Sequence, residues 1–176
     1  MAAAAAQNAS PAAPPDAEKE IERYREMISD PLSNPGFLNV DRGEQLWKTA
    51  RGTKNVSLEQ CDLGEGAGKV EGAYAKLPRY FKDTKRVQDL ESRLVTCMET
   101  LQGFNGAEIA KTAFGRGEMA NVTALATWIA AASRGMRFNL PQQHAEEKKS
   151  YEIGKRSFFY RAGPYDFSCA GCHGED

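Results

Sequence analysis

The residues best suited to chemistry are Cys169, Cys172 and His173, which form a Cys-x-x-Cys-His motif. Two thiols at this spacing can form thioether bonds with the two vinyl groups of one protoporphyrin. The imidazole that follows can then bind the iron as its proximal ligand. The motif is therefore typical of c-type haem attachment. We predict one covalent haem c, held by Cys169 and Cys172, with His173 as the iron ligand.

Other readings of the same motif are a thioredoxin-like redox pair, half of a zinc site, or chance. A redox pair would be expected in a βαβ setting, which the sequence does not indicate. A zinc site would need two more ligands at the usual spacings. His144 lies in the polar stretch 142–146 and is expected to be solvated rather than a ligand.

The composition of the 176 residues, with 41% hydrophobic and 27% charged side chains, is ordinary for a globular protein that builds a core. The net charge of -1 gives no reason to expect nucleic acid or an anionic membrane surface as a partner. No run approaches the eighteen apolar residues that would predict a membrane span.

The sequence has four cysteines, of which the haem motif uses two. Thioether attachment of haem usually takes place outside the cytoplasm, where disulfides also persist. A bacterial periplasmic location would account for all four. Residues 1–15 are rich in alanine and proline, and are expected to be either a disordered lead-in or the remnant of a signal peptide.

The spacing of apolar residues predicts an all-α fold. No segment shows the alternation expected of a strand. Asp16 is a suitable N-cap, Gly163-Pro164 predicts a turn before the haem motif, and glycines follow several of the helical patterns. The predicted helices cover residues 16–30, 41–51, 84–102, 118–134 and 147–161.

A shift of the sequence against itself by 111 residues indicates a decayed repeat. Leu58 and Asp62 then stand where Cys169 and His173 stand in the second copy. We interpret the first copy as a haem-binding domain that has lost its haem, although generic helix–turn similarity remains an alternative. The predicted organisation is two cytochrome c-like domains in tandem, a haem-free one over 16–140 and the incomplete start of a haem-binding one over 141–176. The aligned pairs are Gly43 with Gly154, Trp47 with Phe158, Gly52 with Gly163, Ser57 with Ser168, and Cys61 with Cys172.

The two cysteines outside the motif, Cys61 and Cys97, are expected to form a disulfide across the space that a haem would have filled. The bond would close a loop of 36 residues (97 minus 61), which the chain-entropy model associates with about 3–4 kcal/mol of stability. The alternative is that Cys97, on an apolar helix face, is simply a small buried hydrophobic residue.

The sequence closely resembles the SoxA family, the larger subunits of the SoxAX c-type cytochromes of bacterial thiosulfate oxidation. The similarity runs from about Ile21 to the end and is carried by residues 28–52, 61–81 and 156–176. In that family two cytochrome c-like domains lie in tandem, and some members keep only the C-terminal haem. The resemblance implies the single-haem type, with Cys61 and Cys97 in the positions of the disulfide that replaces the first haem.

The resemblance further implies periplasmic L-cysteine S-thiosulfotransferase activity, in which thiosulfate is joined oxidatively to a cysteine of the carrier complex SoxYZ. SoxX, a small haem subunit, would be the partner. The family's second axial haem ligand is a cysteine that can carry a persulfide. The repeat offset places it near position 208 (97 plus 111), so the sequence is expected to be a fragment whose catalytic residue is unknown. A simple electron-transfer cytochrome and a haem-independent structural domain are the alternatives.

Overall fold

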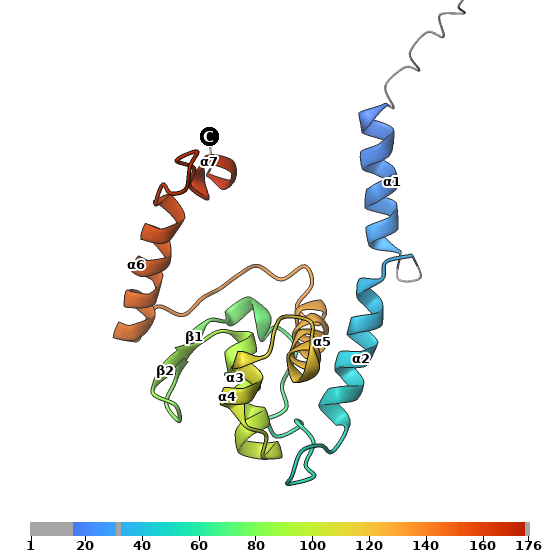
Figure 1. Cartoon of the computed structure of the whole chain (residues 1–176), viewed down its shortest axis with the longest axis vertical. Coiled ribbons are helices and arrows are strands. Elements are labelled where there is room, and N and C mark those ends of the chain that lie inside the picture. Colours follow the sequence, from blue (N-terminus) through green and yellow to red (C-terminus); the bar gives the residue numbers. More distant parts are fainter. Residues whose placement is uncertain (1–15, 31–32, 175–176) are drawn as a thin grey trace, which may run out of the picture. The chain divides into compact units, whose positions relative to one another are not determined.

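The computed structural model describes residues 16–30 and 33–174, so the predicted lead-in 1–15 lies outside the described residues (Figure 1). The chain forms two compact units, residues 1–37 and 38–176. In the first unit, helix α1 covers Ala17–Ser29, and the side chain of Asp16 caps it by accepting a hydrogen bond from the backbone N–H of Glu18. This helix buries none of its residues.

The second unit is mostly helical. Helix α2 (Gly36–Lys48) leads into it from the first unit, and a short 3₁₀ helix follows at Tyr74–Lys76. Next come strands β1 (Arg79–Phe81) and β2 (Arg86–Gln88). The remaining elements are α3 (Leu90–Cys97) with a π-helical extension (Met98–Gln102), α4 (Gly106–Lys111), α5 (Gly117–Ala131), α6 (Ala145–Phe159) and α7 (Ala170–His173). None of the helices in the described ranges is long and apolar enough to cross a membrane.

The strictly all-α expectation is wrong at one place. The predicted helix 84–102 begins only at Leu90, because the side chain of Asp89 caps it by accepting from the backbone N–H of Ser92. The residues before it form an antiparallel hairpin in which Tyr80 pairs with Val87. Each strand has only three residues, too few for a period-2 pattern to stand out.

The core of the second unit is built around α5, against which the 3₁₀ helix, α3 and α4 pack. Val122, Leu125 and Ile129 of α5 are completely buried. A helix surrounded by other elements is expected to be apolar on all sides, which is why the sequence predicts this helix readily.

Helices α2 and α5 approach each other closely, as expected from the apolar faces of both. A Cβ atom added to Gly43 would lie 2.2 Å from the carbonyl oxygen of Ala124, so no residue larger than glycine fits without a shift. The rings of Trp47 and Trp128 lie 5.6 Å apart at the same crossing. Trp47 is buried and Trp128 is half-buried.

Candidate functional site

The haem motif lies on a single helical turn. Cys169 is the N-cap of α7 and His173 is its last residue. The backbone N–H groups of Cys172 and His173 both donate to the carbonyl oxygen of Cys169, at 3.2 and 3.0 Å. Residues three apart on a helical turn share one side of it, so the two thiols are placed to reach one planar group.

Both motif cysteines are free thiols, and with His173 they are exposed. Two free thiols that can form thioethers with the porphyrin, and an imidazole that can bind the iron, are the groups that attach a c-type haem. Within residues 16–30 and 33–174, no three His, Cys, Asp or Glu side chains are grouped so that they could hold a metal ion. The described part of the chain therefore places no further ligands beside the motif that could complete a zinc site.

The loop before the motif has the same backbone pattern as a loop 111 positions earlier. In the first loop, the backbone N–H of Arg51 donates to the carbonyl oxygen of Val56 at 3.1 Å, forming an isolated antiparallel bridge. In the second, Ala162 donates to Phe167 at 3.0 Å in the same way. The two bridges lie 111 positions apart in the sequence, which is the offset of the repeat.

Two backbone conformations repeat inside these loops. Gly52 and Gly163 have φ angles of 70° and 77°, which glycine adopts readily because it has no Cβ. Asn55 and Asp166 both have φ of 51°, a conformation that these two residue types tolerate better than most. The sequence repeat thus has a counterpart in the local backbone.

The first loop has other side chains at two of the haem-motif positions. Leu58, at the position of Cys169, is completely buried in the core. Asp62, at the position of His173, accepts hydrogen bonds at one carboxylate oxygen from the backbone N–H groups of Gly64 and Gly66, at 2.7 and 3.0 Å. Its carboxylate therefore shapes a loop, and nothing at this position resembles an iron ligand.

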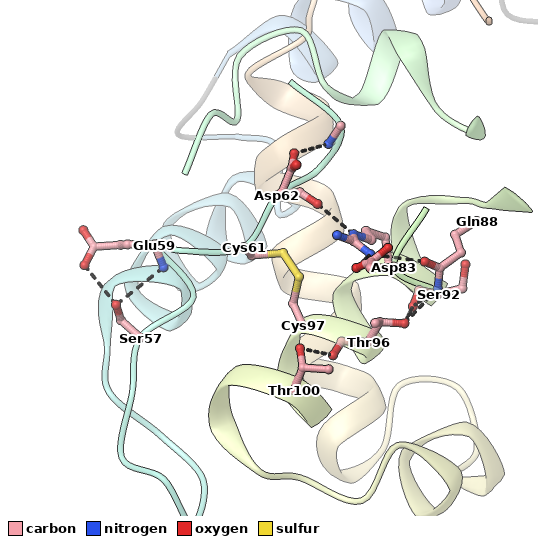
Figure 2. The surroundings of a disulfide bond; sticks show 12 residues. Ser57, Glu59, Cys61, Asp62, Asp83, Gln88, Ser92, Thr96, Cys97 and Thr100 are labelled. Atoms are coloured by element: carbon pink, nitrogen blue, oxygen red, sulfur yellow. Dashed lines mark hydrogen bonds and ion pairs between the residues drawn. A yellow bond between two sulfur atoms is a disulfide. The ribbon is translucent and has the colours of Figure 1, made fainter. Parts of the chain in front are cut away.

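Cys61 and Cys97 are joined by a disulfide, as predicted (Figure 2). Their Cα atoms lie 5.6 Å apart, and both residues are buried at 1% and 4% exposure. The bond ties the loop that follows α2 to the C-terminal residue of α3. It leaves Cys169 and Cys172 as the free thiols of the chain.

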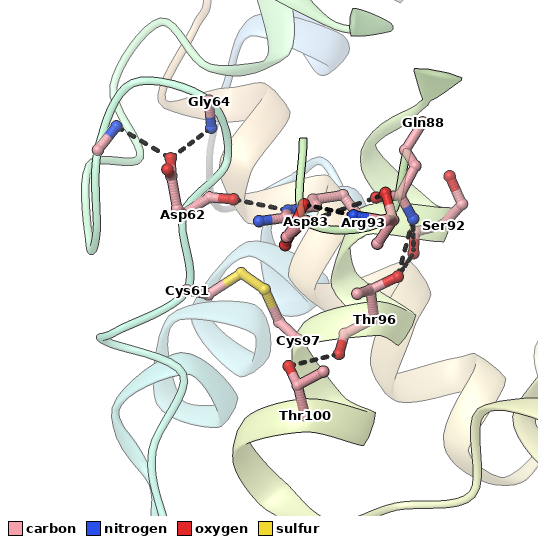
Figure 3. Close-up of polar contacts among 12 residues, drawn as sticks. Cys61, Asp62, Gly64, Asp83, Gln88, Ser92, Arg93, Thr96, Cys97 and Thr100 are labelled. Atoms are coloured by element: carbon pink, nitrogen blue, oxygen red, sulfur yellow. Dashed lines mark hydrogen bonds and ion pairs between the residues drawn. A yellow bond between two sulfur atoms is a disulfide. The ribbon is translucent and has the colours of Figure 1, made fainter. Parts of the chain in front are cut away.

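A buried arginine, Arg93, which no sequence motif singles out, lies beside the disulfide (Figure 3). The Nε of Arg93 donates to the backbone carbonyl oxygen of Asp62 at 2.7 Å, and its Nη1 donates to the carboxylate of Asp83 at 2.7 Å. Burial raises the pKa of Asp83, but the hydrogen bond and charge of Arg93, with the backbone N–H of Thr84, outweigh it and hold the pKa below its usual value.

Glu147 fixes the start of α6 against the hairpin. One of its carboxylate oxygens accepts the backbone N–H of Tyr80 at 2.8 Å, and the other accepts those of Gln143 and His144 at 3.1 and 3.0 Å. Burial raises the pKa of Glu147, but these hydrogen bonds, with the charge of Arg79, hold it below its usual value. A polar residue three positions before a glutamate at a helix start, here His144 and Glu147, is the sequence signature that would have predicted this contact.

His144 has a structural role that the sequence did not predict. It is exposed, as expected, but its Nδ1 accepts the backbone N–H of Glu146 and so caps α6. Its ring also stacks on that of Tyr80, with centroids 3.6 Å apart. His144 is therefore exposed, as expected, and it also caps α6 and packs against the hairpin.

Two curated relatives match most of the length of this chain. The chain is 51% identical over 158 residues to the L-cysteine S-thiosulfotransferase subunit SoxA of Hydrogenophilus thermoluteolus, covering 90% of this chain and 57% of the relative. It is 30% identical over 156 residues to the protein of the same name from Hydrogenobacter thermophilus, covering 88% of this chain and 58% of the relative. The chain thus spans somewhat more than half the length of these relatives.

The crystal structure of SoxXA from P. pantotrophus is similar to this chain with a TM-score of 0.68 and 26% sequence identity, covering 86% of this chain and 53% of the other. Residues 42–138 match the family described as SoxA/TsdA, cytochrome c domain. These residues are more than half of the chain and include the disulfide but not the haem motif. The chain belongs to the SoxA/TsdA cytochrome c domain family.

Proposed function

We propose that this chain is part of the SoxA subunit of an L-cysteine S-thiosulfotransferase, acting in the periplasm in thiosulfate oxidation. The observation that carries the proposal is the 51% identity to a SoxA subunit over 158 residues. That similarity extends over 90% of the chain, whereas a generic c-type cytochrome would share little beyond the haem motif and a few helix positions.

The proposed organisation is two cytochrome c-like domains in tandem, a haem-free domain over 16–140 and a haem-binding domain that begins at 141. The repeated bridges, Arg51 with Val56 and Ala162 with Phe167, support this division. The family match to 42–138 supports a cytochrome c origin for the haem-free part.

Cys169 and Cys172 would hold one haem c through thioether bonds, and His173 would be its proximal ligand. Their exposure and their shared helical turn support this assignment. Haem, when bound, supplies an iron that can accept electrons one at a time. The chain's own contribution is the α7 turn, which presents both thiols and the imidazole in one place.

In the proposed reaction, a cysteine thiolate of the SoxYZ carrier and the outer sulfur of thiosulfate form a new sulfur–sulfur bond. The carrier then holds an S-thiosulfonate group, and the two electrons released are taken up by an external electron acceptor. The SoxX haem subunit is the proposed partner, and the similarity of this chain to the SoxXA structure from P. pantotrophus supports it. The catalytic cysteine is expected near position 208, outside this sequence.

A turnover assay separates this function from that of a simple electron-transfer cytochrome. The full-length protein with its SoxX partner is mixed with thiosulfate, SoxYZ and an electron acceptor. We expect the mass of the carrier to rise by one thiosulfonate group as the acceptor is reduced. A complex that exchanges electrons with the acceptor but never modifies the carrier would be an electron carrier only.

A further inference from the structure

One side of α6 carries apolar residues that the described chain leaves exposed. Ile153, Arg156, Ser157 and Tyr160 follow one another at helical spacing and line an open hollow of about 350 Å³. Ile153 is 47% exposed, and Tyr160, the C-cap of the helix, is 72% exposed. Phe159, next to Tyr160, is exposed as well. These five residues are called the α6 outer face below.

The repeat indicates which side of α6 is covered when its domain is complete. The offset of 111 that relates the two loops also relates the end of α6, at 159, to the end of α2, at 48. It places Gly154 and Phe158 at the positions of Gly43 and Trp47, which are both buried. This side of α6 is therefore expected to be covered by its own domain.

The α6 outer face corresponds to a side of α2 that remains exposed in the first domain. Its fifth member, Ser157, has a half-buried counterpart in Leu46. The elements that pack on α2 leave the other positions in solvent, so the fold alone gives no reason for their counterparts on α6 to be covered. These exposed counterparts of 153, 156, 159 and 160 are Arg42, Gln45, Lys48 and Thr49.

The residue types at these exposed positions differ between the two copies. Polar side chains of the first copy are replaced by large apolar ones in the second. Such a replacement on an exposed surface adds nothing to the core of the domain, and several apolar residues together on a surface mark a site of protein–protein contact. The replacements are Ile153 for Arg42, Phe159 for Lys48 and Tyr160 for Thr49.

The charge on this part of the helix differs as well. Lys155 and Arg156 stand at the positions of Glu44 and Gln45. In α2, Glu44 is paired with Lys48 at 2.6 Å. Neither Lys155 nor Arg156 forms an ion pair with any residue that the structure describes. Both cations can therefore pair with acidic groups of another molecule.

We propose that the α6 outer face is the surface on which the carrier protein of the proposed reaction docks. Its apolar residues form the centre of the contact, and Lys155 and Arg156 form a basic rim. The carrier then presents an apolar surface bordered by acidic residues. The proposal rests on the function proposed above and adds to it the place where the carrier binds.

The small size of the α6 outer face suits a partner that binds and leaves. One side of a helix presents far fewer residues than the roughly 20–30 per partner of a stable interface, which a permanent subunit would need. A carrier must dissociate after each reaction, and complementary charge around a small apolar centre gives fast association without high affinity. Tyr160 also begins the segment that leads to the haem motif, so a carrier bound here is close to that motif along the chain.

Substitutions that restore the residues of the first copy test this surface. The full-length, haem-loaded protein in complex with its SoxX partner carries Ile153→Arg and Tyr160→Thr together. Its dissociation constant for a carrier with an alkylated cysteine, which cannot react, is measured by biolayer interferometry. We expect a rise of at least about tenfold, with unchanged melting temperature, haem absorbance and SoxX content. Phe114→Lys, at an exposed aromatic position between α4 and α5, is the matched control and should leave binding unchanged.

The basic rim is tested by Arg156→Gln, which also restores the residue of the first copy. Binding of the carrier to the unaltered complex should weaken as salt is added, because exposed charges are screened. The substitution should weaken binding severalfold at low salt and reduce this salt dependence. A salt dependence that is the same with and without Arg156 would overturn the role of the rim.

Three results would overturn the docking surface itself. Normal carrier binding by the double variant would show that the α6 outer face has no part in it. Loss of SoxX would assign the face to the subunit interface, and a fall of several degrees in the melting temperature would assign it to packing within the protein. Turnover by the unaltered complex is measured separately, so a complex that modifies the carrier while the double variant binds normally retains the proposed function and excludes only this surface.

Discussion

The guanidinium of Arg93 lies over the ring of Phe81, 4.0 Å from its centroid. The arginine is 6% exposed and the phenylalanine is equally buried. Together they join α3 to the hairpin beside the disulfide, while the hydrogen bond to the carbonyl oxygen of Asp62 reaches the loop of the first copy. A buried cation with an aromatic face, a carboxylate and a carbonyl oxygen around it is well satisfied.

We expect Arg93→Met to destabilise the chain by about 2–3 kcal/mol, because the apolar stem is kept while charge-assisted hydrogen bonds are lost. Urea unfolding at neutral pH measures the loss. Arg86→Met, at an exposed hairpin position, is the matched control and should change stability by less than about 0.5 kcal/mol. Equal effects of the two substitutions would mean that the buried contacts of Arg93 contribute nothing specific.

The disulfide is expected to be structural. Changing Cys61 and Cys97 together to Ser should destabilise the first domain by about 3–4 kcal/mol, because a loop of 36 residues is no longer closed in the unfolded chain. Thermal unfolding should show a melting temperature lower by about ten degrees, at roughly 3–4 °C per kcal/mol for a domain of this size. The rate per haem in the full-length complex should be unchanged. Preserved stability with lost activity would instead identify a redox pair.

Glu147 makes the attachment of α6 to the hairpin dependent on pH. Its pKa in the folded chain lies below the ordinary 4.5, so its stabilising contribution is present above that pH and is lost as the pH falls through the lower, folded-state value. Glu147→Gln should therefore destabilise the chain at pH 7 by about 1–3 kcal/mol. The difference from the unaltered chain should shrink as the solution is acidified below pH 4.5.

Urea midpoints measured at neutral and acidic pH check this prediction. Glu152→Gln on the exposed side of the same helix is the control and should leave the midpoints unchanged. If Glu147→Gln lowers the stability by the same amount at every pH, the charge of the carboxylate has no part in holding α6.

The parts of the fold that can be predicted from the sequence are those with long patterns or unmistakable residue types. The helix around Leu125 is predictable because apolar residues continue over many turns, and the disulfide because Cys61 has Cys97 as its remaining partner. The hairpin and α4 are missed because three-residue strands and a six-residue helix leave no periodicity.

The side-chain arrangements that connect these elements could not be predicted. Arg93 is buried only because residues from two separate segments, Asp62 of a loop and Phe81 and Asp83 of the hairpin, meet around it. Its sequence neighbours do not distinguish it from an exposed helix arginine. The chemistry of the haem motif, by contrast, is apparent from the sequence, because two cysteines and a histidine stand at a characteristic spacing.

The mass of the full-length protein, denatured after expression with a cytochrome c maturation system, tests the proposed haem attachment most directly. We expect the polypeptide mass plus one haem, retained through denaturation because the bonds to Cys169 and Cys172 are covalent, and absent when both cysteines are changed to Ala. A mass equal to that of the polypeptide alone, from a host shown to mature another c-type cytochrome, would contradict covalent attachment and with it the proposed function.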